Sequence, residues 1–324
     1  MKPLFMLFGA LAATFSIATQ AQDPAASYPS RPVRVIVPFP AGGASDIVAR
    51  LVAERAAAAT GQPWVVDNKP GAGATIGGVM VAKAAPDGYT LLLGAAGPLS
   101  MSPHISTVPY DVEKQFVALA SVASVPNLVA VHPSLPAANL SQLVALARSK
   151  PGQLNYGSAG NGTTAHMAGE LLKSQAGVDI THIPYKGTSA AVVDLVAGQI
   201  QMTIDNLPAL LPYVQSGQLR ALAVTSPTRS AAAPSVPTSA EAGMPDFVVR
   251  GWFGFFAPAG TPQGVVDKLS AMLVRMAGEP QMQEALRKVG AEPDIRDSAQ
   301  FAAYVRQENL RWKAVADKAG LRVD

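Results

Sequence analysis

The chain has 324 residues, of which 49% are hydrophobic and 15% are charged, and its formal net charge is +3. This composition is that of a globular protein long enough for two lobes, and it excludes an intrinsically disordered chain. The Lys and Arg residues form no strongly basic patch, so we expect no nucleic-acid partner. The absence of cysteine excludes disulfides, thiolate metal sites and a cysteine nucleophile.

The first 21 residues have the pattern of an export signal. One lysine precedes an apolar run from residue 4 to about residue 18, which ends in small residues. We predict cleavage after Ala21, with Ala18 as the second choice, and therefore a periplasmic protein. The run is short for a bilayer span, and the alternative is a membrane anchor or a buried first helix.

Strands and helices alternate along the rest of the chain. Apolar and β-branched runs bounded by Pro or Gly predict strands, and apolar residues spaced by three or four predict helices. The predicted strands are 33–37, 64–68, 89–94, 154–158, 179–185, 200–205 and 219–225. The predicted helices are 46–59, 75–84, 139–150, 163–175, 188–197, 262–277 and 299–318, with Asn139 or Ser141 and Ser298 as N-caps. This alternation predicts an α/β fold with mainly parallel sheets flanked by helices.

Two extended runs, 120–136 and 245–260, interrupt the alternation. We interpret them as two crossings between lobes that together form a hinge, a known device for closing on small solutes. Lobe 1 is then 22–126 plus 245–324, and lobe 2 is 127–244. The aromatic residues of the second run are interpreted as core and hinge residues, one of which could line the cleft. They are Trp252, Phe253, Phe255 and Phe256.

Four glycine-rich loops join a predicted strand to the helix that follows it. Their sequences are PFPAGGASD, KPGAGATIGG, YGSAGNGTTAH and YKGTSAAVVD. Glycine lets backbone N–H groups approach a ligand, and the first turn of a helix presents unpaired N–H groups and a partial positive charge. Each loop could therefore hold a carboxylate or phosphate oxygen at the carboxyl edge of a sheet. The alternative for any single loop is ordinary turn and cap chemistry.

Common catalytic motifs are missing. There is no G-x-x-x-x-G-K-S/T phosphate loop, and GAGATIG lacks the spacing and the acidic residue of a dinucleotide fingerprint. Ser158 lies in YGSAG, which is not the G-x-S-x-G of a nucleophile elbow. We therefore expect no enzyme. An exported hydrolase using Ser158, His166 and Asp205 is the weaker alternative, with no known spacing to support it.

Three polar residues near these loops allow two interpretations each. His166 could form half of a metal site with Glu170, four residues later, but no third ligand is evident, so we expect no metal. His166 otherwise packs behind its loop or donates a hydrogen bond into the cleft. Asp205 is either a helix cap or a gate that repels a second ligand carboxylate and accepts from an amine or hydroxyl. Lys186 either adds a charge-assisted contact or lies in solvent.

Five blocks of sequence then resemble a known family. They are YPSRPVRVIVPFPAGGASDIVARLVAE, VVDNKPGAGATIGGVMVAKAAPDGYTLLLG, LNYGSAGNGTTAHMAGELLKSQAG, HIPYKGTSAAVVDLVAGQIQMTIDN and LRALAVTS. In this order they resemble the Bug family, the periplasmic solute-binding receptors of tripartite tricarboxylate transporters. The resemblance covers nearly all of the chain after the signal. It implies a two-lobe periplasmic-binding-protein fold, type II-like, that closes on a di- or tricarboxylate, an acidic amino acid or an aromatic acid.

The resemblance also implies a site, in which backbone amides and ordered water from the loops hold one ligand carboxylate. The residues carried over are Phe39, Ala41, Gly42, Gly43, Ser45, Ser158, Gly160, Asn161, Gly162, Thr163, Thr164, Lys186 and Gly187; His166 and Asp205 also match the family pattern. Many relatives have asparagine after the third strand, where this chain has Ser100 and Ser102. That segment helps to select the distal end of the ligand, so the resemblance leaves the identity of the ligand open.

We therefore predict a monomeric receptor that needs no cofactor and hands a small organic carboxylate to membrane transporter subunits. A membrane sensor kinase is the alternative partner, to which the protein would present its ligand. The sequence does not separate transport from sensing.

Overall fold

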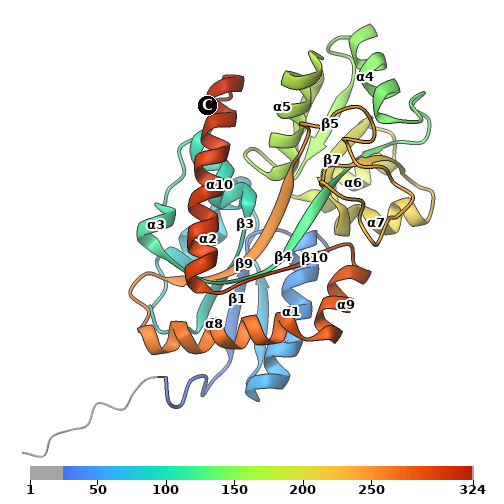
Figure 1. The fold of residues 1–324 in the computed structure, drawn as a ribbon. Coiled ribbons are helices and arrows are strands. Elements are labelled where there is room, and N and C mark those ends of the chain that lie inside the picture. The colour runs from blue at the N-terminus through green and yellow to red at the C-terminus, as the bar shows by residue number, and fades with distance from the viewer. Residues whose placement is uncertain (1–24, 323–324) are drawn as a thin grey trace, which may run out of the picture.

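The computed structural model describes residues 25–322, so the predicted signal 1–21 and its cleavage site lie outside the described residues. Figure 1 shows an α/β protein with two lobes. The strands are β1 (Val33–Val37), β2 (Trp64–Asn68), β3 (Thr90–Ala95), β4 (Phe116–Val131), β5 (Asn155–Ser158), β6 (Thr181–Pro184), β7 (Met202–Asn206), β8 (Arg220–Val224), β9 (Arg250–Pro258) and β10 (Glu292–Arg296).

Helices cover both lobes. They are α1 (Ala44–Thr60), α2 (Thr75–Ala82), α3 (Val112–Gln115), α4 (Leu140–Ser149), α5 (Thr164–Ala176), α6 (Thr188–Val196), α7 (Leu207–Gln215), α8 (Gln263–Gly278), α9 (Pro280–Lys288) and α10 (Ser298–Ala319). Short irregular turns, η1 (Ala72–Ala74), η2 (Gly97–Met101) and η3 (Ser102–His104), lie beside the cleft-facing loops of the first lobe. No helix within residues 25–322 combines the length and the apolar character needed to cross a membrane.

The strands follow one path in the order β2-β1-β3-β9-β4-β7-β5-β6, with β10 and β8 also paired to β4. Strands joined by helices pair in parallel, namely β1 with β2 and β3, and β5 with β6 and β7. The sequence predicts mainly parallel sheets, but the long strands β4 and β9 pair antiparallel with their neighbours, so each lobe has a mixed sheet.

The strands β4 and β9 pass from one lobe to the other (Figure 1). β4 pairs with β9 as far as the Pro126–Arg250 pair, and from Asn127 onward it pairs with β7 instead. A proline suits this point because it donates no hydrogen bond to a ladder. The chain thus changes sheets between Pro126 and Asn127, although the full lobe boundaries stay a prediction.

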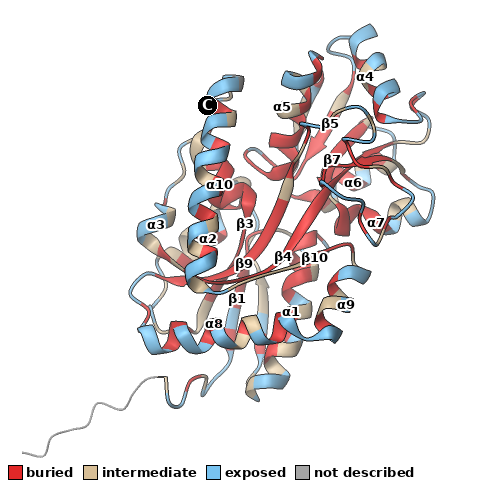
Figure 2. Ribbon diagram, in the orientation of Figure 1, coloured by how far each residue is buried: buried red, intermediate tan, exposed pale blue. Residues whose placement is uncertain are grey.

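The hinge strands are also the centre of the core. β4 and β9 are almost wholly buried, as Figure 2 shows. Trp252 and Phe256 contact Phe301 of α10 with ring centroids 5.3 and 5.0 Å apart, on one face of the sheet. On the other face, Phe255 packs against Trp64. The two crossing strands are therefore well packed, and the cleft loops extend from this core.

Local details differ from the sequence predictions at some ends. Asn139 caps α4 by accepting from the N–H of Gln142, as one of the two alternatives predicts. The predicted cap Ser298 is wrong, because Asp297 caps α10 through a reciprocal capping box with Gln300. Helix α9 and strand β10 were not predicted, since EPDIR shows neither apolar alternation nor β-branched enrichment.

Candidate functional site

A small cavity lies between the two lobes and is lined by residues of both. The N-cap or first turn of four helices reaches its wall. These positions are Gly43, Ala44 and Ser45 on α1, Thr163 and Thr164 on α5, Thr188 on α6, and Asn206 before α7. The side chains that line the cavity, among residues 25–322, include no Lys or Arg. Backbone N–H groups at the helix ends are therefore the groups in the wall that could attract an anion.

The cavity measures about 30 Å³, the space of about two water molecules. The lobes are thus at close approach, and a ligand larger than this space can enter only when they part. Phe39, Trp252 and Phe253 contribute apolar surface to the lining, so two of the four aromatic residues of the second crossing reach the cleft, one more than the sequence suggested.

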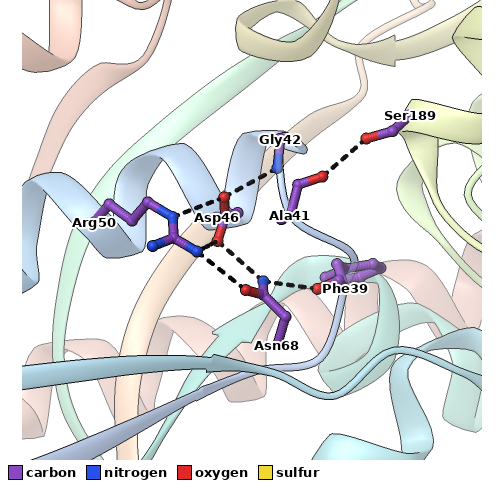
Figure 3. Close-up of polar contacts among 7 residues, drawn as sticks. All are labelled: Phe39, Ala41, Gly42, Asp46, Arg50, Asn68 and Ser189. Atoms are coloured by element: carbon purple, nitrogen blue, oxygen red, sulfur yellow. Dashed lines mark hydrogen bonds and ion pairs between the residues drawn. The ribbon is translucent and has the colours of Figure 1, made fainter.

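Asp46 organises the first loop, as Figure 3 shows. One carboxylate oxygen accepts from the N–H of Gly42 at 2.9 Å and from Nε of Arg50 at 3.0 Å, while the other accepts from Nδ2 of Asn68 at 3.0 Å. The same Nδ2 donates to the carbonyl of Phe39. Burial alone would raise the pKa of Asp46, but the hydrogen bonds from Arg50, Gly42 and Asn68 outweigh it and hold the pKa below its usual value.

This arrangement leaves the end of α1 open toward the cavity. Gly43 is the N-cap of α1 and carries no side-chain cap. The N–H of Gly42 is already bound to Asp46, so Gly42 shapes the turn with a φ of 81° and its amide is not available to a ligand. The amides that follow Gly43 in the first turn have no intrahelical acceptor, and they lie at the cavity wall.

The second-lobe loop is held from behind by buried side chains. Oγ of Ser158 accepts from the N–H of Gly160 at 3.1 Å and lies 2.6 Å from Nε2 of His182. Nδ1 of His166 accepts from the N–H of Gly162 at 3.1 Å. The amides of Gly160 and Gly162 are therefore bound within the protein. Ser158 and His166 are buried and shape the loop, which leaves Thr163 and Thr164 to face the cavity.

Two histidine rings stack behind this loop, with the centroids of His166 and His182 4.1 Å apart. Burial lowers the pKa of His182 to about 3, with the neighbouring His166 adding to the effect. Burial also lowers the pKa of His166. Both rings are therefore neutral at neutral pH, which suits the acceptor role of Nδ1 in His166.

The stacked histidines predict a pH dependence of stability. Their pKa values lie below the unfolded value of about 6.5, so the unfolded chain binds more protons as the pH falls below 6.5 and the native state loses stability. We expect the melting temperature to fall between pH 6.5 and pH 4.5, and His182→Asn to weaken this slope. His132→Asn, on the loop after β4, serves as the control. A slope unchanged in His182→Asn would contradict a neutral buried pair.

Asp205 lies at the wall of the cavity and is 1% exposed. Its carboxylate accepts from Oγ1 of Thr188 at 2.7 Å and from the N–H of Asn206 at 2.7 Å. Burial raises the pKa of Asp205, and these two hydrogen bonds offset it only in part. The helix cap that the sequence allows is not formed, because the N-cap of α7 is Asn206 and it has no side-chain cap. Asp205 instead ties Thr188 of α6 to β7 at the cavity wall, and its role as a gate stays a prediction.

The other predicted residues lie around the cavity. Gly160, Asn161 and Lys186 line a larger open groove beside it. The carbonyl of Ala41 accepts from Oγ of Ser189 at 3.1 Å, a contact between the lobes (Figure 3). Gly187 lies directly against Pro40 of the first loop. The predicted residues therefore fall into three groups: some line the cavity, some hold the loops in place, and some lie at the edge of the cleft.

Several cavity residues escaped the sequence reasoning. Gly97 and Ala96 follow β3, and Thr188 begins α6. The GAAGPLS segment was recognised for its serines, yet Ser100 and Ser102 do not line the cavity. Ser100 is fully buried next to Nδ2 of Asn309. A glycine two residues past the end of β3 was the local sign of a close backbone approach, although it does not identify the contact.

Ser158, His166 and Asp205, the residues of the hydrolase alternative, do not form a catalytic triad. Ser158 pairs with His182, whereas His166 binds the N–H of Gly162 and Asp205 binds Thr188. Ser158 is also fully buried. Glu170, the partner of the suggested half metal site, accepts from Tyr156 and Lys173. In the described part of the chain, no cluster of three potential metal ligands occurs.

Comparison with known proteins identifies the family. The model of the tripartite tricarboxylate transporter family receptor matches residues 48–321. Protein BugT of Bordetella pertussis is 38% identical over 100% of this chain and 99% of its own. The structure of R. palustris Rpa4515 with adipate matches at a TM-score of 0.89 and 38% identity, covering 91% of this chain and 99% of that one.

A second structure with a bound ligand is also similar to this chain. MatC from Rhodopseudomonas palustris with bound malate matches at a TM-score of 0.85 and 34% identity, over 89% of this chain and 99% of that one. This chain therefore belongs to the tripartite tricarboxylate transporter family of receptors and is a periplasmic solute-binding protein of the Bug type.

Proposed function

We propose that the protein captures a small organic carboxylate between its lobes and delivers it to a tripartite tricarboxylate-type membrane transporter. The observation that carries this proposal is the convergence of four helix N-termini on a cavity whose described lining contains no Lys or Arg. Such a wall favours one compact anionic group through backbone N–H donors.

The energies require that the helix ends act together. One helix N-terminus contributes about 0.3–1 kcal/mol, and up to about 2 kcal/mol when partly buried. A micromolar ligand needs about 8 kcal/mol. The open end of α1 alone is insufficient, so the second lobe must close over the ligand and add the ends of α5 and α6; the end of α7 already binds the carboxylate of Asp205. Two related receptors hold adipate and malate in structures that match this one across both lobes.

We propose that the ligand contacts the predicted residues that line the cavity, and that the remaining predicted residues shape the loops and the cleft edge. The cavity-lining members are Phe39, Gly43, Ser45, Thr163, Thr164 and Asp205. Asp205 limits the choice of ligand, because a buried carboxylate repels a second anionic group placed beside it. The far end of the ligand is therefore apolar or carries a hydrogen-bond donor where it approaches Asp205.

A thermal-shift screen tests the proposal. The panel contains adipate, malate, succinate, citrate, glutamate and nicotinate, each paired with its amide or ester lacking the free carboxylate. A ligand at 100 times its Kd adds about 2.7 kcal/mol to stability, so at least one acid should raise the melting temperature by several degrees. Shifts with none of the acids, or equal shifts with the neutral analogues, would overturn carboxylate capture.

Delivery to a transporter is tested separately in cells. Deleting the gene should abolish high-affinity uptake of the radiolabelled acid that binds, and plasmid expression should restore the uptake. Unchanged uptake, together with loss of an acid-induced transcriptional response, would instead favour presentation of the ligand to a sensor kinase.

A further inference from the structure

Four glycines lie so close to the opposite lobe, across the cleft, that a side chain on any of them would contact it. A Cβ on Gly73, in η1, would lie 2.5 Å from the carbonyl oxygen of Asn161, and one on Gly97 would lie 2.9 Å from Cα of Thr163. A Cβ on Gly162 would overlap Oγ of Ser102, and one on Gly187 would overlap the ring of Pro40. Two of these glycines belong to the first lobe and two to the second, and each lies in a loop that borders the cavity or its adjoining groove.

We propose that Gly73, Gly97, Gly162 and Gly187 form a closure surface that lets the lobes approach until both sets of helix N-termini reach one ligand. This inference rests on the proposed function. A side chain on any of the four would stop the lobes before that distance. Relieving the 2.9 Å contact at Gly97 to an ordinary contact of 3.4–4 Å would hold the lobes about 0.5–1 Å apart, and a gap of about that size already forfeits a quarter to a half of each van der Waals contact across it.

At Gly97, an effect on lobe closure can be measured without an effect on backbone geometry. Gly73, Gly162 and Gly187 have φ values of 61°, 75° and 135°, which other residues rarely adopt, so a substitution there would strain the loop whatever surrounds it. The φ of Gly97 is outside that region. Any residue could adopt the backbone of Gly97, and only the backbone of residues 162–164, within 3.1 Å of the added Cβ, excludes a side chain.

The test compares three Gly→Ala variants. Gly97→Ala introduces a methyl group against the opposite lobe. Gly254→Ala introduces one into the core, 2.7 Å from the carbonyl of Ala120 and against the ring of Phe301, where no hinge motion can relieve the contact. Gly278→Ala, at the end of α8, points into open space. None of the three positions has a φ in the range that favours glycine.

The three variants should differ in stability and affinity. In the absence of added acid, Gly97→Ala should melt within about 2 °C of the wild type, because opening the lobes relieves the contact, whereas Gly254→Ala should melt several degrees lower. Affinity, measured by calorimetry for adipate and malate, should fall at least tenfold in Gly97→Ala and stay unchanged in Gly278→Ala. A melting temperature of Gly97→Ala as low as that of Gly254→Ala, or undiminished affinity, would overturn the closure surface.

A distance measurement makes failure of this inference distinct from failure of the proposed function. Because the chain has no native cysteine, spin labels can be placed at the exposed positions Lys83 and Ser149, one on each lobe. Pulsed electron paramagnetic resonance on the protein with no acid added should show that Gly97→Ala lacks the shortest distances of the wild type. Identical distance distributions would contradict the inference even if no acid in the panel binds.

Discussion

Gly43→Val is expected to lower the affinity for the captured acid by about 10- to 100-fold, the equivalent of about 1–3 kcal/mol of overpacking. Gly43 lines the cavity at the uncapped end of α1, and a branched side chain there covers the first-turn amides. The fold should tolerate the change, because the φ of Gly43 is −78° and the nearest atom to an added Cβ is the carbonyl oxygen of Pro40 at 3.6 Å.

Lys186→Ala is the matched control for this prediction. Lys186 lines the open groove and not the cavity, and an exposed charge contributes at most about 1 kcal/mol, so affinity should change by no more than about fivefold. Calorimetry on both variants, with melting temperatures as the check on folding, measures the difference. Equal losses in the two variants would contradict capture by backbone amides and favour a charged side chain as the main anion contact.

Asp46→Ala is expected to weaken both stability and binding. The substitution removes the acceptor of the Gly42 N–H, in the turn before α1, and of Nδ2 of Asn68, at the end of β2. Losing partly buried hydrogen bonds to a charged acceptor costs about 1.5–3 kcal/mol, so the melting temperature should fall by several degrees. The loop then no longer fixes Gly43 at the cavity, and affinity should fall more than about tenfold.

The control for Asp46 is its partner Arg50, whose side chain is 55% exposed. Arg50→Ala removes the ion pair but keeps the acceptor for Gly42 and Asn68, so it should change stability and affinity only slightly. Urea unfolding and calorimetry measure the two effects separately. Asp46→Ala with lower stability but wild-type affinity would contradict a role for Asp46 in positioning the binding loop.

The sequence predicted the fold because each βαβ unit is specified by residues that are close together in the chain. The strand Val33–Val37 is β-branched and buried, and the helix after it has glycine before it and glycine at its end. The strand β10 could not be found in this way. Its five residues, EPDIR, pair with residues 121–124 of β4, which lie far away in the sequence, and such tertiary pairing leaves no periodic signal.

The sequence predicted which loops form the candidate site, but not what each residue in those loops does. Gly42, Gly160 and Gly162 were expected to offer amides, yet their N–H groups bind Asp46, Ser158 and His166. The pairing of Ser158 with His182 joins residues 24 positions apart on neighbouring strands. Which amide a loop satisfies internally depends on such contacts between elements, and residue spacing alone does not encode them.

The role of Gly97 at the cleft could not be predicted from residue spacing either. Nothing near it in the sequence requires glycine, since its backbone conformation suits any residue. The requirement arises from Thr163, 66 positions later in the chain, when the lobes approach. Contacts that exist only between lobes are invisible to local pattern, although the glycine-rich strand ends do mark where such contacts occur.

Native mass spectrometry tests the central claim most directly. The full chain after export, purified without denaturation, is incubated with an equimolar mixture of the six acids and their neutral amide or ester analogues, and the mass retained by the folded protein is recorded. We predict one retained small molecule per protein chain, and that it is an acid with a free carboxylate. Retention of a neutral analogue in preference to its acid, or retention of none of the mixture, would contradict carboxylate capture between the lobes.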